Sequence, residues 1–329
     1  MSEENASNKA CLIAATLDGK GGWQTFDTAG GTPPLPPAGS VYWLHVNATH
    51  PDARRFLADT LGLPHPAVTA LLRDEIRPRY VELGDNSMIF LRGITFVPGP
   101  EPGDLASLRL WVTPQGIISA GRRKSHVASV LKRQLDNGDG PHNVAGMVTS
   151  ILDILNDALE PLLQEVDENL EAVEDEIPTD STLSTRRRFA ELRRVVSQYR
   201  RHLSPQRDML SRLVHAQREW MDTASRWQVQ EAFDRTTRFI EDLDTLRERA
   251  EIVADDITNA QNMRLNRNLY LLSVITVIFM PLTFITGLLG MNVEGIPGAA
   301  HPHAFALIVG LSALIIVVQV LLFRRFRWL

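Results

Sequence analysis

The last quarter of the chain contains two long apolar runs. Residues 269–289 read LYLLSVITVIFMPLTFITGLL, in which Tyr270 is the one ionisable side chain, and residues 304–323 carry no charge. Each run has about 20 residues, and a helix of that length crosses the ~30 Å hydrocarbon core of a bilayer. Two buried helices of a soluble core would give a similar pattern, but such cores rarely need two runs back to back. The pattern predicts two transmembrane helices.

The basic residues around these runs predict their orientation. Arg264 and Arg267 precede the first run, and three arginines lie in the tail 324–329, whereas residues 269–323 contain no lysine or arginine. Loops rich in lysine and arginine stay on the cytoplasmic side. We therefore expect a multi-pass protein of the inner cell membrane with both termini in the cytoplasm, an external loop at 291–303 and a basic cytoplasmic tail.

The first run is not uniformly apolar, because one helical face carries small polar groups. Steps of three to four residues connect these positions, and the same register continues toward the N-terminus through carboxamides to a carboxylate. Hydroxyl and amide groups are costly in lipid unless they face protein or water, although a serine or threonine can also bond back to its own helix. The face consists of Asp255, Asn259, Asn262, Asn266, Leu269, Ser273, Thr276, Met280, Thr283 and Gly287.

This polar face predicts a water-lined path, and such a path implies an oligomer. Two helices cannot enclose a pore, so several copies must contribute the same face around a symmetry axis. Pro281 lies within the first run and weakens the backbone hydrogen bonding there. We therefore expect a modest bend in this helix.

The first part of the chain, 1–144, has the pattern of an α/β domain. Short apolar runs predict strands and amphipathic stretches predict helices. The predicted strands are 11–17, 40–46, 80–83, 88–96, 108–113 and 116–120, and the predicted helices are 51–61 and 65–76.

The next part, 145–227, is predicted to be a helical hairpin. Apolar residues from Ile151 to Ile177 recur at alternating steps of four and three, as in a coiled coil. Residues 150–180 hold 11 acids and no base, whereas 181–218 hold 10 arginines and two acids. An arginine run alone would suggest nucleic-acid binding. The adjacent acidic run favours two antiparallel helices that offset each other's charge.

A helical pattern then continues without interruption through 228–290, so a stalk helix leads directly into the first transmembrane helix. Its apolar seam includes Ile240, Leu243, Leu246 and Val253, and we expect copies of the chain around the axis to cover it. With the two membrane helices, the fold class is an α+β membrane protein with a cytosolic α/β domain.

Composition excludes several function classes. The formal net charge of −5 gives no general attraction to nucleic acid. Cys11 is the single cysteine, so one chain can form no disulfide and no Cys-x-x-Cys metal site. The sequence has no phosphate-binding glycine loop and no nucleophile motif, so we expect no enzyme and no tightly bound cofactor.

The end of the first membrane run carries the motif that indicates function. The sequence FMPLTFITGLLGMN ends in Gly290-Met291-Asn292, directly before the external loop. This arrangement resembles the CorA-type divalent-cation transporters, in which a Gly-Met-Asn tripeptide closes the pore-lining helix at its outer mouth. The soluble α/β domain, the hairpin and the stalk extend the resemblance over nearly the whole chain. The resemblance implies a funnel-shaped homopentamer in lipid.

Within that family the sequence is most similar to the zinc-transport branch, the ZntB type. The features are LRLWVTP at 108–114, RRK at 122–124 and GIPG at 295–298. Magnesium-type members tend to carry more acids in the outer loop, where this chain has Glu294 alone. The resemblance therefore favours Zn²⁺ as cargo, with a Mg²⁺ or Co²⁺ channel as the alternative and Ni²⁺ and Cd²⁺ as further candidates. A membrane-anchored scaffold that moves no ion is the alternative from another class.

The resemblance also implies roles for single residues. Asn292 would bind the hydration shell of the ion, Gly290 would let the backbone turn, and Glu294 would concentrate cations outside. Leu272 and Met280 are candidate hydrophobic constrictions, and both are equally ordinary apolar membrane residues. Asp255 is a candidate vestibule acid or one more solvated charge.

Two histidines in the outer loop are weaker candidates. His301 and His303 are zinc-type ligands, but no third ligand lies nearby in the sequence, so a solvated loop is the simpler interpretation. The zinc branch implies proton coupling, yet the first membrane run has no His, Asp, Glu or Lys. His301, His303 and Glu294 are the nearest titratable groups to the outer mouth.

Overall fold

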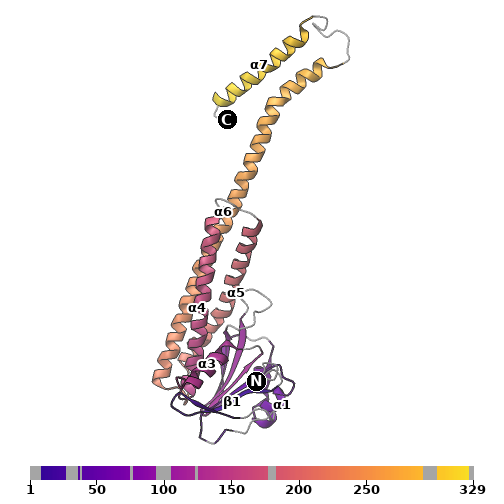
Figure 1. The fold of residues 1–329 in the computed structure, drawn as a ribbon. Coiled ribbons are helices and arrows are strands. Elements are labelled where there is room, and N and C mark those ends of the chain that lie inside the picture. Colours follow the sequence, from indigo (N-terminus) through magenta and orange to yellow (C-terminus); the bar gives the residue numbers. More distant parts are fainter. Residues whose placement is uncertain are drawn as a thin grey trace. The chain divides into compact units, whose positions relative to one another are not determined.

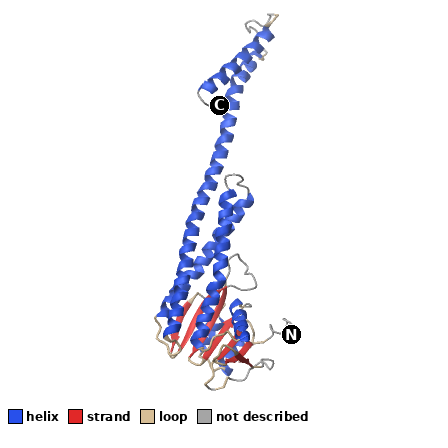
Figure 2. Cartoon of the chain, turned by 60° about the vertical axis from the view of Figure 1, so that its left-hand side comes forward, coloured by secondary structure: helices blue, strands red, loops and turns tan. Residues whose placement is uncertain are grey.

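The computed structural model describes residues 9–26, 36–37, 39–74, 77–93, 105–122, 125–176, 183–291 and 302–325. The chain divides into two compact units, Met1–Ala254 and Asp255–Leu329. The first unit contains a β-sheet and several helices, and the second contains the apolar helices (Figures 1 and 2).

The first unit is built on one seven-stranded sheet. Its strand order is β2-β1-β3-β7-β6-β5-β4, and all neighbouring strands are antiparallel except β3 and β7. The strands are β1 (Cys11–Leu17), β2 (Trp23–Thr25), β3 (Tyr42–Asn47), β4 (Arg79–Leu83), β5 (Asn86–Gly93), β6 (Ala106–Thr113) and β7 (Gly116–Gly121).

Helices cover both faces of this sheet, so the predicted α/β architecture is confirmed. On one face, α1 (Ala53–Arg55), the π-helical turn η2 (Phe56–Thr60) and α2 (His65–Leu72) bury side chains such as Leu57 and Leu71. On the other face, α3 (His126–Asn137), α4 (Val144–Glu176) and α5 (Leu183–Val214) contribute to a second apolar core. Alternate strand residues enter the two cores, as the pleat requires.

Two elements were not predicted from the sequence, β2 and α3. They are linked by Trp23, whose indole N–H donates to Asp136 of α3 at 2.9 Å. The α3 helix has ordinary end signals, because the Ser125 hydroxyl accepts the N–H of Ala128 and Gly138 is left-handed with φ 81°. These signals were present in the sequence, but three residues of β2 are too few to show a period.

Helix α2 ends at Leu72, earlier than the predicted end at residue 76. Arg73 is extended, with φ −61° and ψ 143°. Arg109 donates to the carbonyl of Arg73 at 2.6 Å, and Arg122 donates to the carbonyl of Leu72 at 3.1 Å. Cations stabilise the negative end of a helix dipole, so these two arginines from the sheet side define where α2 ends.

The long helix α6 (Thr223–Leu289) begins five residues before the predicted start of the stalk. Helices α4 and α5 run alongside its N-terminal half (Figures 1 and 2). In that half, Ile240, Leu243, Leu246 and Val253 are buried within the single chain. The expectation that copies of the chain cover this seam was wrong, because helices of the same chain cover it.

The predicted seam of α4 is confirmed over most of its length. Ile151, Leu155, Leu159 and Leu170 are all buried. Next to Pro161 the prediction was wrong by one residue, because Leu163 is buried and the expected Leu162 is half-buried. The expected Ile177 lies outside the described residues.

The acids of α4 find their partners mainly on α6, which differs from the predicted charge pairing within the hairpin. Glu176 pairs with Arg188 of α5 close to the turn of the hairpin. Four other acids of α4 form ion pairs with two arginines of α6. These pairs are Arg235 with Asp157 and Glu160, and Arg249 with Asp167 and Glu174. These ion pairs therefore connect α6 to α4. A further ion pair connects Arg200 of α5 to Asp244 of α6.

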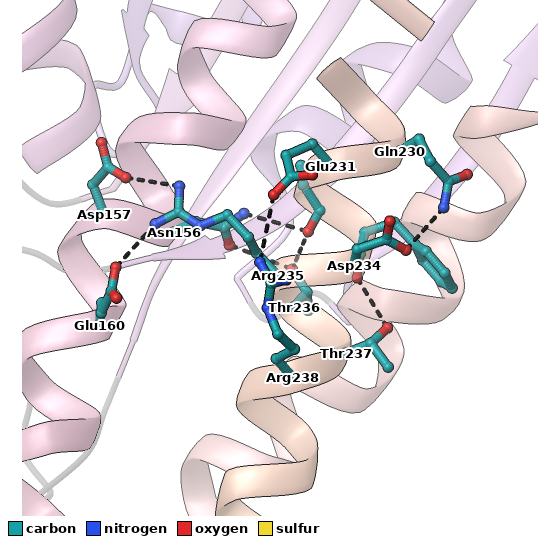
Figure 3. A network of polar contacts seen from close by, with 12 residues as sticks. Asn156, Asp157, Glu160, Gln230, Glu231, Asp234, Arg235, Thr236, Thr237 and Arg238 are labelled. Atoms are coloured by element: carbon teal, nitrogen blue, oxygen red, sulfur yellow. Dashed lines mark hydrogen bonds and ion pairs between the residues drawn. The ribbon is translucent and has the colours of Figure 1, made fainter. Parts of the chain in front are cut away.

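Figure 3 shows this polar contact zone around Arg235. The guanidinium donates to Asp157 at 2.8 Å and to Glu160 at 3.2 Å. Burial of the guanidinium opposes its charge, but the hydrogen bonds and charges of the two acids outweigh that effect and raise the pKa of Arg235. Beside it, Thr236 donates to Asn156 in the buried contact between the helices.

Asp153 and Asp157 lie one turn apart on α4. We expect the removal of their charges to have opposite effects on the stability of the fold. Burial, followed by the charge of Asp157, raises the pKa of Asp153, and Arg235 only partly offsets this. The folded protein therefore binds this proton more tightly than the unfolded chain, and ionised Asp153 destabilises the fold at neutral pH. We expect Asp153→Asn to raise the melting temperature of the detergent-solubilised chain at pH 7. The gain should shrink as the pH falls through the raised pKa of Asp153, and it should vanish below about pH 3, where aspartate is protonated in both states.

Asp157→Asn is the matched control for this experiment. It removes a charged hydrogen-bond partner of Arg235. We expect the free energy of unfolding to fall by about 1 kcal/mol at pH 7. Equal effects of the two substitutions on the melting temperature would contradict the assignment.

Candidate functional site

The candidate site lies on the C-terminal part of α6, which pairs with α7 (Ala304–Arg325) in the second unit. Both helices are long and apolar enough to span a membrane, and their most apolar windows are not buried within the chain. Such exposed apolar surface requires lipid or other protein around it. The two helices predicted from the sequence are therefore present as candidate membrane spans, from Ala304 to Arg325 in α7 and in the last part of α6.

One side of α6 faces α7. The half-buried residues in this part of the helix recur every three or four positions, with one adjacent pair, and they lie on a single face. They are Val274, Ile278, Pro281, Leu282 and Ile285. This face is the one that the second helix of the same chain covers.

The predicted polar face lies about half a turn away from the face that packs on α7. In the membrane segment all of its members are exposed: Leu269, Ser273, Thr276, Met280, Thr283 and Gly287. The candidate constrictions Leu272 and Met280 are also exposed, by 61% and 69%. No described part of the chain covers these side chains, so they remain available to neighbouring copies, lipid or water.

The hydroxyl groups on this face differ in their bonding. Thr276 donates to the carbonyl of Leu272 at 2.8 Å, so its proton is satisfied by its own helix. Among the described residues, Ser273 and Thr283 have no side-chain hydrogen bond. A hydroxyl that donates to its helix keeps lone pairs that can accept from water. The face thus presents oxygen acceptors along α6.

A shallow groove runs over this part of α6. It is lined by Ile275, Thr276, Phe279, Met280, Thr283 and Phe284. Figure 1 shows that the axis of α6 bends in its C-terminal part, and Pro281 is the proline inside this helix. Threonine hydroxyls and a methionine thus share the groove with three large apolar side chains.

The predicted outer mouth is only partly within the described residues. Gly290 follows the last residue of α6, and its N–H donates to the carbonyl of Thr286 at 2.9 Å. A Cβ at position 290 would lie 2.9 Å from that carbonyl oxygen, so a side chain there would be crowded. Met291 is half exposed. Asn292, Glu294, the GIPG sequence and His301 lie outside the described residues, and so do two residues of the RRK sequence.

The remaining candidate residues lie on the stalk part of α6 and directly before α7. Asp255, Asn259, Asn262 and Asn266 are all exposed on α6. His303 precedes α7, and its carbonyl accepts the N–H of Leu307 at 3.1 Å. In the described ranges, no three His, Cys, Asp or Glu side chains are grouped closely enough to hold a metal ion.

Acids on the first half of α6 are engaged in ordinary surface contacts. Asp234 accepts from Gln230 at 2.9 Å, and Glu231 pairs with Arg238 at 3.4 Å (Figure 3). These contacts are those of a charged helix surface.

The comparison with protein families decides between the interpretations of the whole chain. The model described as "CorA-like Mg2+ transporter protein" matches residues 38–325. The chain belongs to this family. As a CorA-family chain it has the soluble α/β domain, the long helix and the two membrane-type helices described above, and its function is divalent-cation transport.

Two relatives of this CorA-family chain are similar over most of its length. The divalent cation transporter CmaX of Pseudomonas aeruginosa is 37% identical over 291 residues, which cover 87% of each chain. The zinc transport protein ZntB of Yersinia enterocolitica is 33% identical over 290 residues, which cover 88% of this chain and 87% of the relative.

Solved structures agree with this fold. Full-length CmaX superposes with a TM-score of 0.82 at 32% identity, covering 98% of this chain and 99% of CmaX. The CorA magnesium transporter of Methanocaldococcus jannaschii gives a TM-score of 0.83 at 19% identity, covering 96% and 98%. At that identity the second similarity concerns the fold alone.

One polar residue of the membrane helices was not singled out from the sequence. Gln319 is the one carboxamide in α7, and its Nε2 donates to the carbonyl of Val277 in α6 at 3.0 Å. A carboxamide among valines was the signal that pointed to it.

Proposed function

We propose that this CorA-family chain carries Zn²⁺ across the inner membrane through a pore that several copies form around one axis. The observation that carries the proposal is the exposed polar face of α6 on the side opposite α7. With α7 on one side of α6 and hydroxyl groups on the other, α6 is the helix suited to the inner ring. The outer ring is then α7, with its apolar surface toward lipid.

The number of copies and the orientation are part of the proposal. Five copies follow from the family resemblance, and two helices per chain require more than two copies to enclose a path. Arginines at 264, 267, 324 and 325, with none in the described residues between them, support cytoplasmic termini.

The residues of the path have distinct proposed roles. Ser273, Thr276 and Thr283 offer oxygen acceptors to a hydrated ion along the membrane segment. Rings of Leu272 and Met280 form apolar constrictions. When water leaves such a constriction, ions can no longer pass through it. Gly290, Met291 and Asn292 form the outer mouth, and Glu294 raises the local cation concentration in front of it. Asp255 and the asparagines at 259, 262 and 266 continue the path on the cytoplasmic side.

Zinc is favoured as cargo by two observations. Relatives named zinc transport protein ZntB are similar over about nine-tenths of the chain. The outer loop carries one carboxylate, Glu294. Magnesium is the second candidate, in agreement with the description of the matched family. Mg²⁺ keeps its water shell tightly and prefers oxygen ligands.

Uptake into proteoliposomes tests the cargo. Purified chain is reconstituted, and radioactive zinc uptake is measured with and without a pH gradient and with excess Mg²⁺. We expect zinc uptake that excess magnesium does not suppress. Suppression by magnesium would assign a magnesium channel, and no uptake of either ion would leave a membrane anchor without transport activity.

The pH gradient in the same assay tests proton coupling. Stimulation by an inward proton gradient would be expected for the coupled mechanism that the zinc branch implies. Alanine variants of Glu294, His301 and His303 then identify the titrating group, and an unchanged pH dependence in all three would exclude them.

A further inference from the structure

Pro281 removes one backbone donor from α6. In an α-helix the N–H of residue i bonds to the carbonyl of residue i−4, and proline has no N–H. The carbonyl of Val277 therefore has no helical donor. Inside the hydrocarbon region of a membrane water cannot satisfy that carbonyl, so leaving it unpaired is costly.

Gln319 supplies the donor that Pro281 lacks. Its Nε2 lies 3.0 Å from the carbonyl oxygen of Val277, across the contact between α7 and α6. A carbonyl only accepts, so the amide nitrogen must be the atom that points toward it. The link joins residues 42 positions apart, and it reaches the one carbonyl that the proline leaves free.

The carboxamide oxygen of Gln319 makes no stabilising hydrogen bond among the described residues. This oxygen, Oε1, is buried. A carboxamide in a membrane helix is unfavourable, and an unpaired buried oxygen adds to that cost. A leucine at 319 would avoid both costs. The amide N–H donated to Val277 is therefore what this residue contributes.

We propose that Gln319 is a positioning residue for transport, which holds the bend of α6 at Pro281 by replacing the missing backbone donor. Thr276 lies before the bend, and Thr283, Gly287 and Gly290 lie after it. The bond therefore sets the direction of the last turns of α6, which lead to the Gly-Met-Asn mouth. The effect on flux rests on the proposed function, whereas the hydrogen bond and the bend do not.

A double-mutant cycle tests the proposal, with Gln319→Leu and Pro281→Ala in the full-length chain. An interhelical hydrogen bond in a membrane changes the ratio of two conformational populations roughly threefold, and at most about twentyfold. We expect Gln319→Leu to lower the maximal rate of zinc uptake by a factor in that range. The zinc concentration at half-maximal rate should stay unchanged, because Gln319 lies on α7 and not on the proposed ion path along α6.

Pro281→Ala gives the Val277 carbonyl its own backbone donor. In that background the Val277 carbonyl no longer needs the amide N–H of Gln319. Gln319→Leu should therefore cause no further loss of uptake. An equal loss in both backgrounds, or no loss in either, would overturn the proposal. Ser312→Ala is the matched control on α7, because the Ser312 hydroxyl bonds to the carbonyl of Ile308 in its own helix at 2.9 Å. It should behave as the parent chain.

Distances across the bend separate this inference from the proposed function. Spin labels at positions 271 and 288, in oligomers diluted with unlabelled subunits, report the bend by pulsed electron spin resonance in lipid. We expect Gln319→Leu to broaden the distance distribution in the parent background and to leave it unchanged with Pro281→Ala. If the parent chain takes up no zinc, the proposed function fails while this measurement still decides the role of Gln319. An unchanged distribution in the parent background would refute that role.

Discussion

Asn292→Ala is expected to abolish zinc uptake while the oligomer remains assembled. The proposed ring of Asn292 carboxamides hydrogen-bonds the water shell of an arriving ion, and alanine has neither donor nor acceptor to replace it. Dications leave bulk water only when other groups compensate for the lost hydration. Removing the whole ring at once therefore removes the binding step at the mouth.

The measurement is radioactive zinc uptake into proteoliposomes, with the oligomeric state checked by size-exclusion chromatography. Thr286→Val is the control at the same end of α6, because the Thr286 hydroxyl already donates to the carbonyl of Leu282 at 2.9 Å. It lies outside the proposed polar face and should keep its uptake. Normal uptake by Asn292→Ala would show that the tripeptide does not serve as the mouth.

Cysteines at positions 276 and 283 are expected to react with a charged, membrane-impermeant thiol reagent and to block uptake once labelled. A thiolate forms in water and is suppressed in lipid, so positions lining a wet path should react at least about tenfold faster than positions in contact with apolar groups. The matched controls are Val274→Cys and Ile285→Cys, which lie on the face of α6 that packs on α7.

The natural cysteine does not interfere with this experiment. Cys11 is 1% exposed, and burial, only partly offset by backbone hydrogen bonds, raises the pKa of its thiol to about 12. The labelling can thus be done in the natural sequence. If the thiols at 276 and 283 reacted only with lipid-soluble reagents, the polar face would be in lipid and the pore assignment would fail.

The two halves of the molecule were predictable to different degrees. The strands 11–17, 108–113 and 116–120 are found almost as predicted, because each forms a complete local pattern of apolar residues. Helix α2 was predicted too long, because its end depends on Arg109 in β6 and Arg122 directly after β7, both distant in the sequence. For the candidate site, the sequence indicated the polar register of α6 but gave no information on which side α7 covers.

The sequence by itself determined the membrane helices, the long α6, the α/β class and the Gly-Met-Asn motif, because these depend on local periodicity and on neighbouring residues. Only the tertiary structure decided that the acids of α4 pair with Arg235 and Arg249, and that the apolar seam of α6 is covered within one chain. It also revealed the bond from Gln319 to Val277. These contacts join residues 42 to 82 positions apart. Local patterns say which face of a helix needs a partner, and only packing selects that partner.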